Sequence, residues 1–189
     1  MSTDPDSCHD CPMGDRVRVR GTGAEPCRLM VVGTAPSTEE EFVGMPFEGK
    51  TSQVIKEAIF GLGLSNQTYY TNILQRRPVS LAGDNRRPTN QEMMICGRHL
   101  DSDIRRLKPD LILAVGSTPL NYLMGQKIPS IKLVHGLVLR VERFGMLLSV
   151  MPVFDPAYVA RSGGLLSNLG ETWVTDLLSV KTNLEVGIG

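Results

Sequence analysis

Residues 29–49 read LMVVGTAPSTEEEFVGMPFEG, and this stretch decides the fold. Its first four residues form a continuous apolar run, which is typical of a strand that is buried on both faces. The run ends at Gly33 and enters a loop rich in glycine, proline and glutamate. Loops at the carboxyl end of a buried parallel strand commonly hold the ligand site of an α/β protein, so we expect a functional site here.

The rest of the chain continues the alternation of apolar strands and helical patterns. A second continuous apolar run, DLILAVG at 110–116, predicts another buried strand. Further strands are expected at 68–74, 137–141 and 146–153, and helices at 52–61, 90–107, 117–124 and 173–180. This alternation indicates an α/β fold with a parallel sheet covered by helices on both faces.

Length and composition fit one globular domain. The chain has 189 residues, and 20 Lys and Arg balance 20 Asp and Glu, which excludes a strongly basic, histone-like protein. No apolar run approaches the ~18 residues of a membrane span, and the first residues lack the features of a secretory signal. We therefore expect a cytoplasmic monomer without membrane contact. We expect a single domain over residues 1–189, with residues 1–26 as a cysteine-containing segment packed on it.

Three loops that follow apolar strands carry polar side chains. The first, GTAPSTEEEFVGMPFEG at 33–49, contains Phe47. The second follows the Thr-Asn-Ile of residues 71–73 and contains two pairs of arginines. The third begins with Phe-Asp-Pro at 154–156 and is followed by Arg161. Two cysteines spaced C-x2-C precede these loops, and Cys96 lies between the second loop and the strand at 110–116.

This ordered set resembles the family 4 uracil-DNA glycosylases, the iron–sulfur branch of the uracil-DNA glycosylase superfamily. The family pattern begins G-E-A-P-G-x-x-E-D-x-x-G-x-P-F-x-G and continues with T-N, with N-R-x-P and with H-P followed by an arginine. The resemblance extends from residue 8 to about residue 180. It implies a three-layer α/β/α domain around a four-stranded parallel sheet. It also implies a DNA repair hydrolase that cleaves the N-glycosidic bond of a pyrimidine flipped out of DNA.

The resemblance further implies which side chains bind the base. Phe47 would stack on the flat ring of the base. Asn72 would read the edge of the pyrimidine, because its amide offers both donors and an acceptor. We expect Ala35 to line the same site. Phe47 could instead be a core aromatic residue, and Asn72 a residue that caps a loop.

Three positions depart from the family pattern or replace its catalytic groups. Thr34 stands at the family's glutamate, so the retained Glu40 becomes the candidate that orients or activates water, unless it belongs to a solvated acidic face. Asp155 stands at the family's histidine. A protonated Asp155 could donate to the leaving base, a carboxylate could stabilise a cationic sugar-like transition state, and a plain turn residue is the third alternative. His135 could donate to a phosphate or to the base, or could be an ordinary surface histidine. We expect Thr34, Glu40 and Asp155 to be catalytic and His135 to bind substrate.

The cysteines are the next candidate site. The resemblance implies a four-iron, four-sulfur cluster, and Cys8, Cys11 and Cys96 match three of its ligands. We expect the fourth position near Ile112, where the chain has no cysteine. If the strands at 29–32 and 110–116 are paired, Cys27 would lie within a couple of residues of Ile112 and could supply the fourth thiolate. Zinc bound by the same thiolates, or a lost cluster with Cys27 as a buried thiol, are the alternatives.

Basic residues gather on the loops that follow the strands. We expect DNA phosphates to be bound by Arg76, Arg77, Arg86, Arg87 and Arg161, although arginines could also solvate a surface loop. Leu165 or Leu166 is a candidate wedge into the base stack. The predicted substrate is uracil or a modified pyrimidine in single- or double-stranded DNA. The alternative is a catalytically inactive DNA-binding module on the same fold.

Overall fold

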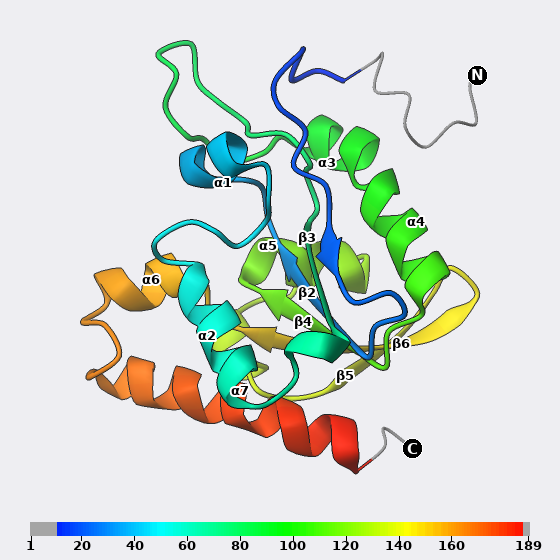
Figure 1. Cartoon of the computed structure of the whole chain (residues 1–189), viewed down its shortest axis with the longest axis vertical. Helices are drawn as coiled ribbons and strands as arrows, with labels where there is room; N and C mark the ends of the chain where they lie inside the picture. The colour runs from blue at the N-terminus through cyan, green and yellow to red at the C-terminus, as the bar shows by residue number, and fades with distance from the viewer. Residues whose placement is uncertain (1–10, 187–189) are drawn as a thin grey trace.

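A computed structural model describes residues 11–186, and a six-stranded sheet runs through the middle of the molecule (Figure 1). The strand order is β1-β3-β2-β4-β6-β5. The inner strands pair in parallel: β2 (Leu29–Gly33), β3 (Thr68–Asn72), β4 (Leu111–Val115) and β6 (Met146–Val153). Both edge strands, β1 (Thr22–Gly23) and β5 (Leu139–Arg143), are antiparallel. The mixed α/β architecture is therefore confirmed, and the sheet has four parallel inner strands with an added antiparallel strand at each edge.

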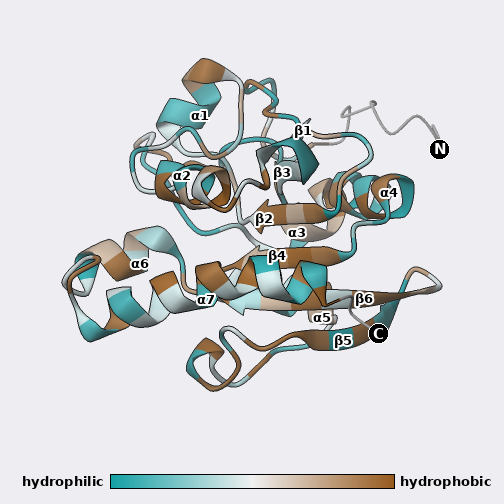
Figure 2. Cartoon of the chain, turned by 60° about the horizontal axis from the view of Figure 1, so that its bottom comes forward, coloured by the Kyte–Doolittle hydropathy of each residue, from teal (hydrophilic) through white to brown (hydrophobic). Residues whose placement is uncertain are grey.

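The inner strands are apolar because both of their faces are covered. Every residue of β2 and β4 is buried, and Figure 2 shows both strands as hydrophobic. Side chains alternate between two cores, with Leu29 and Val31 in one and Met30 and Val32 in the other. This alternation follows from the period of two residues in a β-strand. The continuous apolar runs in the sequence thus predicted the centre of the sheet.

Helices form a layer on each face of the sheet. One core is shared with α2 (Gln53–Gly61), α6 (Pro156–Arg161) and α7 (Asn168–Glu185). The other core is shared with α3 (Asn90–Cys96), α4 (Arg98–Leu107) and α5 (Ser117–Met124). Two short 3₁₀ helices, Ser65–Gln67 and Ile131–Leu133, and the six-residue α1 (Thr38–Val43) complete the described elements. Within the described residues, no helix is long and apolar enough to cross a membrane.

The helical expectations needed two corrections. The single helix expected at 90–107 is two helices that meet at Gly97, where a Cβ atom would lie 2.3 Å from the Tyr122 hydroxyl oxygen. The carboxyl-terminal helix begins five residues before the expected start because Ser167 caps it and accepts a hydrogen bond from the Gly170 N–H. The short helices α1 and α6 were not predicted.

The strand register brings the loops of interest to one end of the sheet. Gly33 is paired with Asn72, so β2 and β3 end at the same level. The N–H of Ile73 then donates to the Gly33 carbonyl, and the N–H of Gly116 donates to the Val153 carbonyl. Because parallel strands place their carboxyl ends together, the loops after β2, β3, β4 and β6 meet there.

Candidate active site

A cavity of about 430 Å³ opens where β2, β3 and β6 end. Loop residues between β2 and α2 form most of its wall, and Val115 and Pro156 close it from the neighbouring strands. Six of the residues predicted from the sequence line this cavity: Thr34, Ala35, Glu40, Phe47, Asn72 and Asp155. The structure thus brings together side chains that are up to 121 residues apart in the chain, from Thr34 to Asp155.

Phe47 forms an apolar wall of the cavity in an unusual backbone conformation. Its φ angle is 59°, in the left-handed region that residues other than glycine rarely adopt, and its side chain is 3% exposed. The ring lies 5.8 Å from the Tyr70 ring, centroid to centroid. It also packs so closely on Gly33 that a Cβ atom there would lie 3.2 Å from its Cζ. A strained residue held this firmly is typical of a binding site.

Glu40 holds the loop that carries Phe47. The N–H of Ser37 donates to its Oε2 at 2.6 Å, and the N–H of Phe47 donates to its Oε1. In return the N–H of Glu40 donates to the Ser37 hydroxyl, which completes a capping box at the start of α1. Because Glu40 is only 5% exposed, a solvated acidic face is excluded for this residue. The spacing S-x-x-E was a signal for this capping role that the sequence analysis missed.

Asn72 leaves an unsatisfied donor at the cavity. Its side chain is 4% exposed, and its Oδ1 lies against Gly33, where a Cβ atom would be only 2.2 Å away. The amide nitrogen Nδ2 is buried and has no hydrogen-bond partner among the described residues. Leaving such a donor unpaired costs ~1–3 kcal/mol, so an acceptor on a bound ligand would be favourable here.

Asp155 lies at the junction of the cavity with two neighbouring hollows. It is the N-cap of α6, and its Oδ1 accepts hydrogen bonds from the N–H groups of Ala157 (2.8 Å) and Tyr158 (3.3 Å). Its Oδ2 has no hydrogen-bond partner within residues 11–186 and remains available to a ligand. Gly116 makes room beside it, since a Cβ atom there would lie 3.4 Å from the Asp155 Cβ.

Known proteins resemble this chain over most of its length. A family model described as "Uracil DNA glycosylase superfamily" matches residues 20–176. The type-4 uracil-DNA glycosylase of Archaeoglobus fulgidus is 31% identical over 159 residues, which cover 81% of this chain and 78% of that protein. The type-4 uracil-DNA glycosylase of Thermotoga maritima is 32% identical, over 82% of this chain and 79% of that protein. This chain belongs to the uracil-DNA glycosylase superfamily. The resemblance seen in the sequence is confirmed.

His135 stands outside the cavity of this superfamily member, contrary to the prediction. Its Nδ1 lies 2.7 Å from Oδ2 of Asp176, and its ring packs on Phe154 with centroids 4.7 Å apart. Burial raises the pKa of Asp176, and the hydrogen bond with His135 partly lowers it again. The Trp173 indole N–H also donates to the Phe154 carbonyl. His135 therefore supports the residue before Asp155 and does not contact the cavity itself.

The arginines of the second loop divide into two groups. Arg77 donates to Glu41 and to Asn85, both at 2.7 Å, and Arg86 binds both oxygens of Glu92. The guanidinium of Arg86 holds the pKa of Glu92 below its usual range. These two arginines organise the loop that lies beside the cavity.

The remaining predicted arginines have no ion-pair partner within residues 11–186. Arg87 and Arg161 are exposed, whereas Arg76 is partly buried and its Nε has no hydrogen-bond partner there. Arg87 lines a hollow of about 420 Å³ that shares Thr34, Ala35 and Asp155 with the main cavity. Lys50, which the site prediction omitted, lines the main cavity.

The structure places only three of the four cysteines, because Cys8 lies outside the described residues. Cys27 and Cys96 are buried, and Cys11 is partly exposed. Cys27 lies near the start of β3, because it precedes β2 and the first residue of β2 pairs with Thr68. Cys96 lies beyond the end of β3, where its sulfur accepts a hydrogen bond from the Gln75 N–H. Since β3 spans four residue steps, ~13 Å at ~3.3 Å per residue, one cluster cannot bind both sulfurs.

Cys27 lies in an apolar environment. It is buried, and burial raises the pKa of its thiol to about 11. Among residues 11–186, no group of three His, Cys, Asp or Glu side chains could hold a metal ion. The pairing of β2 with β4 was predicted correctly, but Cys27 and Cys96 lie at opposite ends of β3, so Cys27 does not replace the fourth ligand of a cluster that includes Cys96.

Hydrogen bonds attach the amino-terminal segment to the domain near Cys96. The N–H of Val19 donates to the Gln75 carbonyl at 2.7 Å, and the Arg18 Nε donates to the Gln75 side chain at 2.6 Å. The Arg18 guanidinium also lies 3.1 Å from Nδ1 of His99. These contacts involve residues 18 and 19 and need no metal ion.

Proposed function

We propose that this chain hydrolyses the N-glycosidic bond of uracil, or of a uracil with a substituent at C5, in DNA. The observation that carries the proposal is the buried, unpaired Nδ2 of Asn72 beside the Phe47 ring, within one cavity at the carboxyl end of the sheet. A flat ligand with a hydrogen-bond acceptor on its edge would satisfy both groups. Since a base within a duplex stack is inaccessible to such a cavity, the nucleotide must be flipped out.

The contacts of Asn72 favour a pyrimidine with an oxygen at C4. Uracil carries an acceptor there, which the Asn72 N–H can reach, whereas cytosine carries an amino group that would meet a second donor. The Phe47 ring offers the stacking face. Thr34 is shorter than the glutamate of the family pattern and faces the hollow beside Arg87, so a substituent at C5 has room.

Asp155 supplies the negative charge that the reaction needs. As the C1′–N1 bond breaks, the sugar becomes cationic, and a carboxylate beside it stabilises that charge. The two N–H contacts hold Oδ1 in place, which leaves Oδ2 for the sugar and the water. The free Oδ2 orients the attacking water and accepts its proton, and the base leaves as an anion that solvent protonates. Glu40 acts in this proposal as a positioning residue for Phe47.

An excision assay on single-stranded oligonucleotides tests the proposal. The oligonucleotides carry one uracil, one 5-hydroxymethyluracil or one cytosine, and alkali-labile abasic sites are scored. We expect the wild type to cleave at uracil and at 5-hydroxymethyluracil but not at cytosine. Asn72→Ala should lose this preference for 4-oxo bases over cytosine. Binding of DNA without any abasic site would overturn the proposal and favour a catalytically inactive DNA-binding module.

A further inference from the structure

A second hollow shares Asp155 with the base cavity. It measures about 360 Å³, and the loop between α5 and the 3₁₀ helix Ile131–Leu133 forms one wall. Asp155 is the only carboxylate among the described residues that line it, whereas Lys127 and Lys132 supply two positive charges. The hollow is therefore cationic and directly adjoins the proposed reaction centre.

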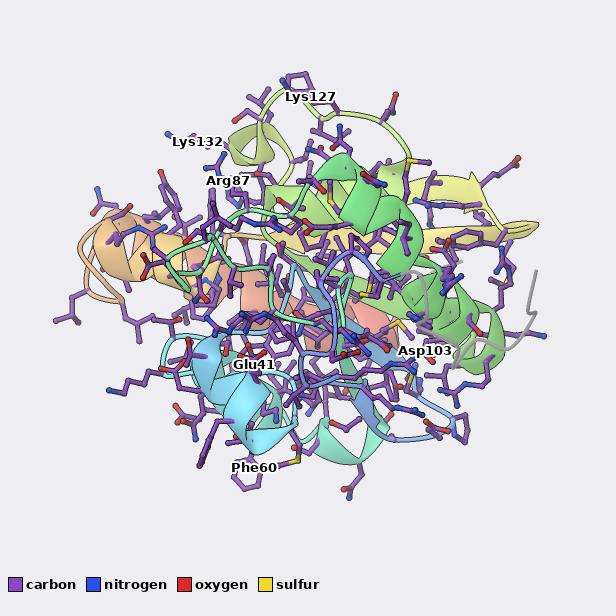
Figure 3. All side chains as sticks on the ribbon, turned by 90° about the horizontal axis from the view of Figure 1, so that it is seen from above. Glu41, Phe60, Arg87, Asp103, Lys127 and Lys132 are labelled. Carbon is purple, nitrogen blue, oxygen red and sulfur yellow. The ribbon has the colours of Figure 1, made fainter. Side chains whose placement is uncertain are left out.

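Its two lysines are available to a ligand. Both are exposed, and neither has an ion-pair partner within residues 11–186. The loop that presents them is fixed by hydrogen bonds, because the Ile128 N–H donates to the Asn121 side chain and the Lys132 N–H donates to the Ser130 hydroxyl. In Figure 3, both lysines lie on the same side of the molecule as Arg87. Fixed, unpaired cations along one side are suited to the phosphates of a nucleic-acid strand.

An aromatic side chain lines the same hollow as the lysines and Asp155. Tyr158 lines the hollow and is 37% exposed, so part of its ring faces solvent. Its position is fixed because its N–H donates to Asp155 and its ring contacts Phe154, with centroids 6.0 Å apart. Exposed aromatic rings beside basic groups are the usual stacking platforms for the bases of single strands.

We propose that this hollow is a second nucleotide subsite, which binds the residue next to the flipped nucleotide on the same DNA strand. The neighbouring base stacks on Tyr158, and the phosphates that follow it contact Lys127 and Lys132. The inference rests on the proposed function, since it takes DNA as the ligand of the adjoining cavity. It places the strand along these lysines and not along Arg77 and Arg86, whose charges are used within the protein.

Fluorescence binding measurements test the subsite without any catalysis. The probes are single-stranded oligonucleotides with one 2′-fluoro-deoxyuridine, which resists cleavage, and with 2-aminopurine as either its 5′ or its 3′ neighbour. We expect the wild type to quench one of the two probes. Tyr158→Ala should remove that quenching and weaken binding by about 5- to 150-fold, whereas Tyr158→Phe should retain both because it keeps the ring.

The salt dependence of binding tests the lysines separately. For single strands, the slope of log K against log salt changes by ~0.7 per phosphate contact, so Lys127→Ala with Lys132→Ala should reduce it by about 1.4. Lys181→Ala is the matched control, since Lys181 lies on α7 beside Glu185. An unchanged slope in the double variant, or unchanged quenching in Tyr158→Ala, would overturn the subsite. Excision assays decide the proposed function independently, because these probes are never cleaved.

Discussion

Asp155 combines a structural role and a proposed chemical role in two different oxygen atoms. Asparagine caps helices about as well as aspartate, so Asp155→Asn should keep the hydrogen bonds of Oδ1 and change stability by less than ~0.5 kcal/mol. It removes the charge beside the sugar, so we expect excision to fall by ~10²- to 10⁴-fold. Single-turnover cleavage and Tm of the same protein measure the two effects. Full activity in Asp155→Asn would exclude a charge-based role.

Glu40 is expected to act through Phe47. Glu40 accepts hydrogen bonds from two backbone N–H groups, one on each carboxylate oxygen. Glu40→Gln keeps one of these oxygens but replaces the other with an amide NH₂ group, which faces an N–H donor. An unsatisfied buried donor costs ~1–3 kcal/mol, so Tm should fall by ~2–4 °C for each kcal/mol. We expect the KM for uracil-containing DNA to rise more than kcat falls, because the stacking wall is displaced while Asp155 is untouched. A loss confined to kcat would instead indicate that Glu40 activates water.

The loop between β3 and α3 depends on the ion pair of Arg86 and Glu92. Arg86 lowers the pKa of Glu92 in the folded protein. The ion pair therefore contributes its full stabilisation at pH values above the pKa of an unfolded glutamate, ~4.5. This stabilisation is lost as the pH falls through the lower pKa that Glu92 has in the folded protein. Arg86→Gln should therefore lower Tm near pH 7 and leave Tm unchanged near pH 3.

Arg87→Gln is the matched control for this loop. Arg87 is exposed and has no ion-pair partner in the described part of the chain, so its loss should leave Tm unchanged at both pH values. Thermal unfolding followed by circular dichroism measures all three proteins. An equal loss of Tm in Arg86→Gln at both pH values would show that packing, and not the ion pair, supports the loop.

The elements differed in how well the sequence predicted them. Apolar runs identified β2 and β4 because burial on both faces leaves a continuous hydrophobic signature. Helices α1 and α6 have only six residues each, too few to show a helical period, and their visible signals are the caps Ser37 and Asp155. The sequence analysis treated Asp155 as a loop residue with a functional role and gave Ser37 none, and the structure shows that each begins a helix.

At the scale of the whole molecule, the sequence predicted the contents of the cavity better than the contacts around it. Loops after parallel strands converge by topology, so three loops could be assigned to one site, and the family resemblance selected Phe47, Asn72 and Asp155 within them. His135 and Cys27 could not be placed in this way, because their positions depend on side-chain packing and on which end of a strand they occupy.

The position of Cys27 leads to a prediction about metal content. Cys27 precedes β2 at the end of the sheet opposite Cys96, and burial raises the pKa of its thiol to about 11. Iron and zinc per chain, measured by mass spectrometry after anaerobic purification, should therefore be equal in the wild type and in Cys27→Ala. A chelator should change the Tm of both proteins equally, because Cys27 lies away from Cys96. The contacts of Arg18 and Val19 with Gln75 hold the amino-terminal segment without Cys27. Arg18→Ala should therefore lower Tm, and a loss of iron in Cys27→Ala would restore Cys27 as a ligand.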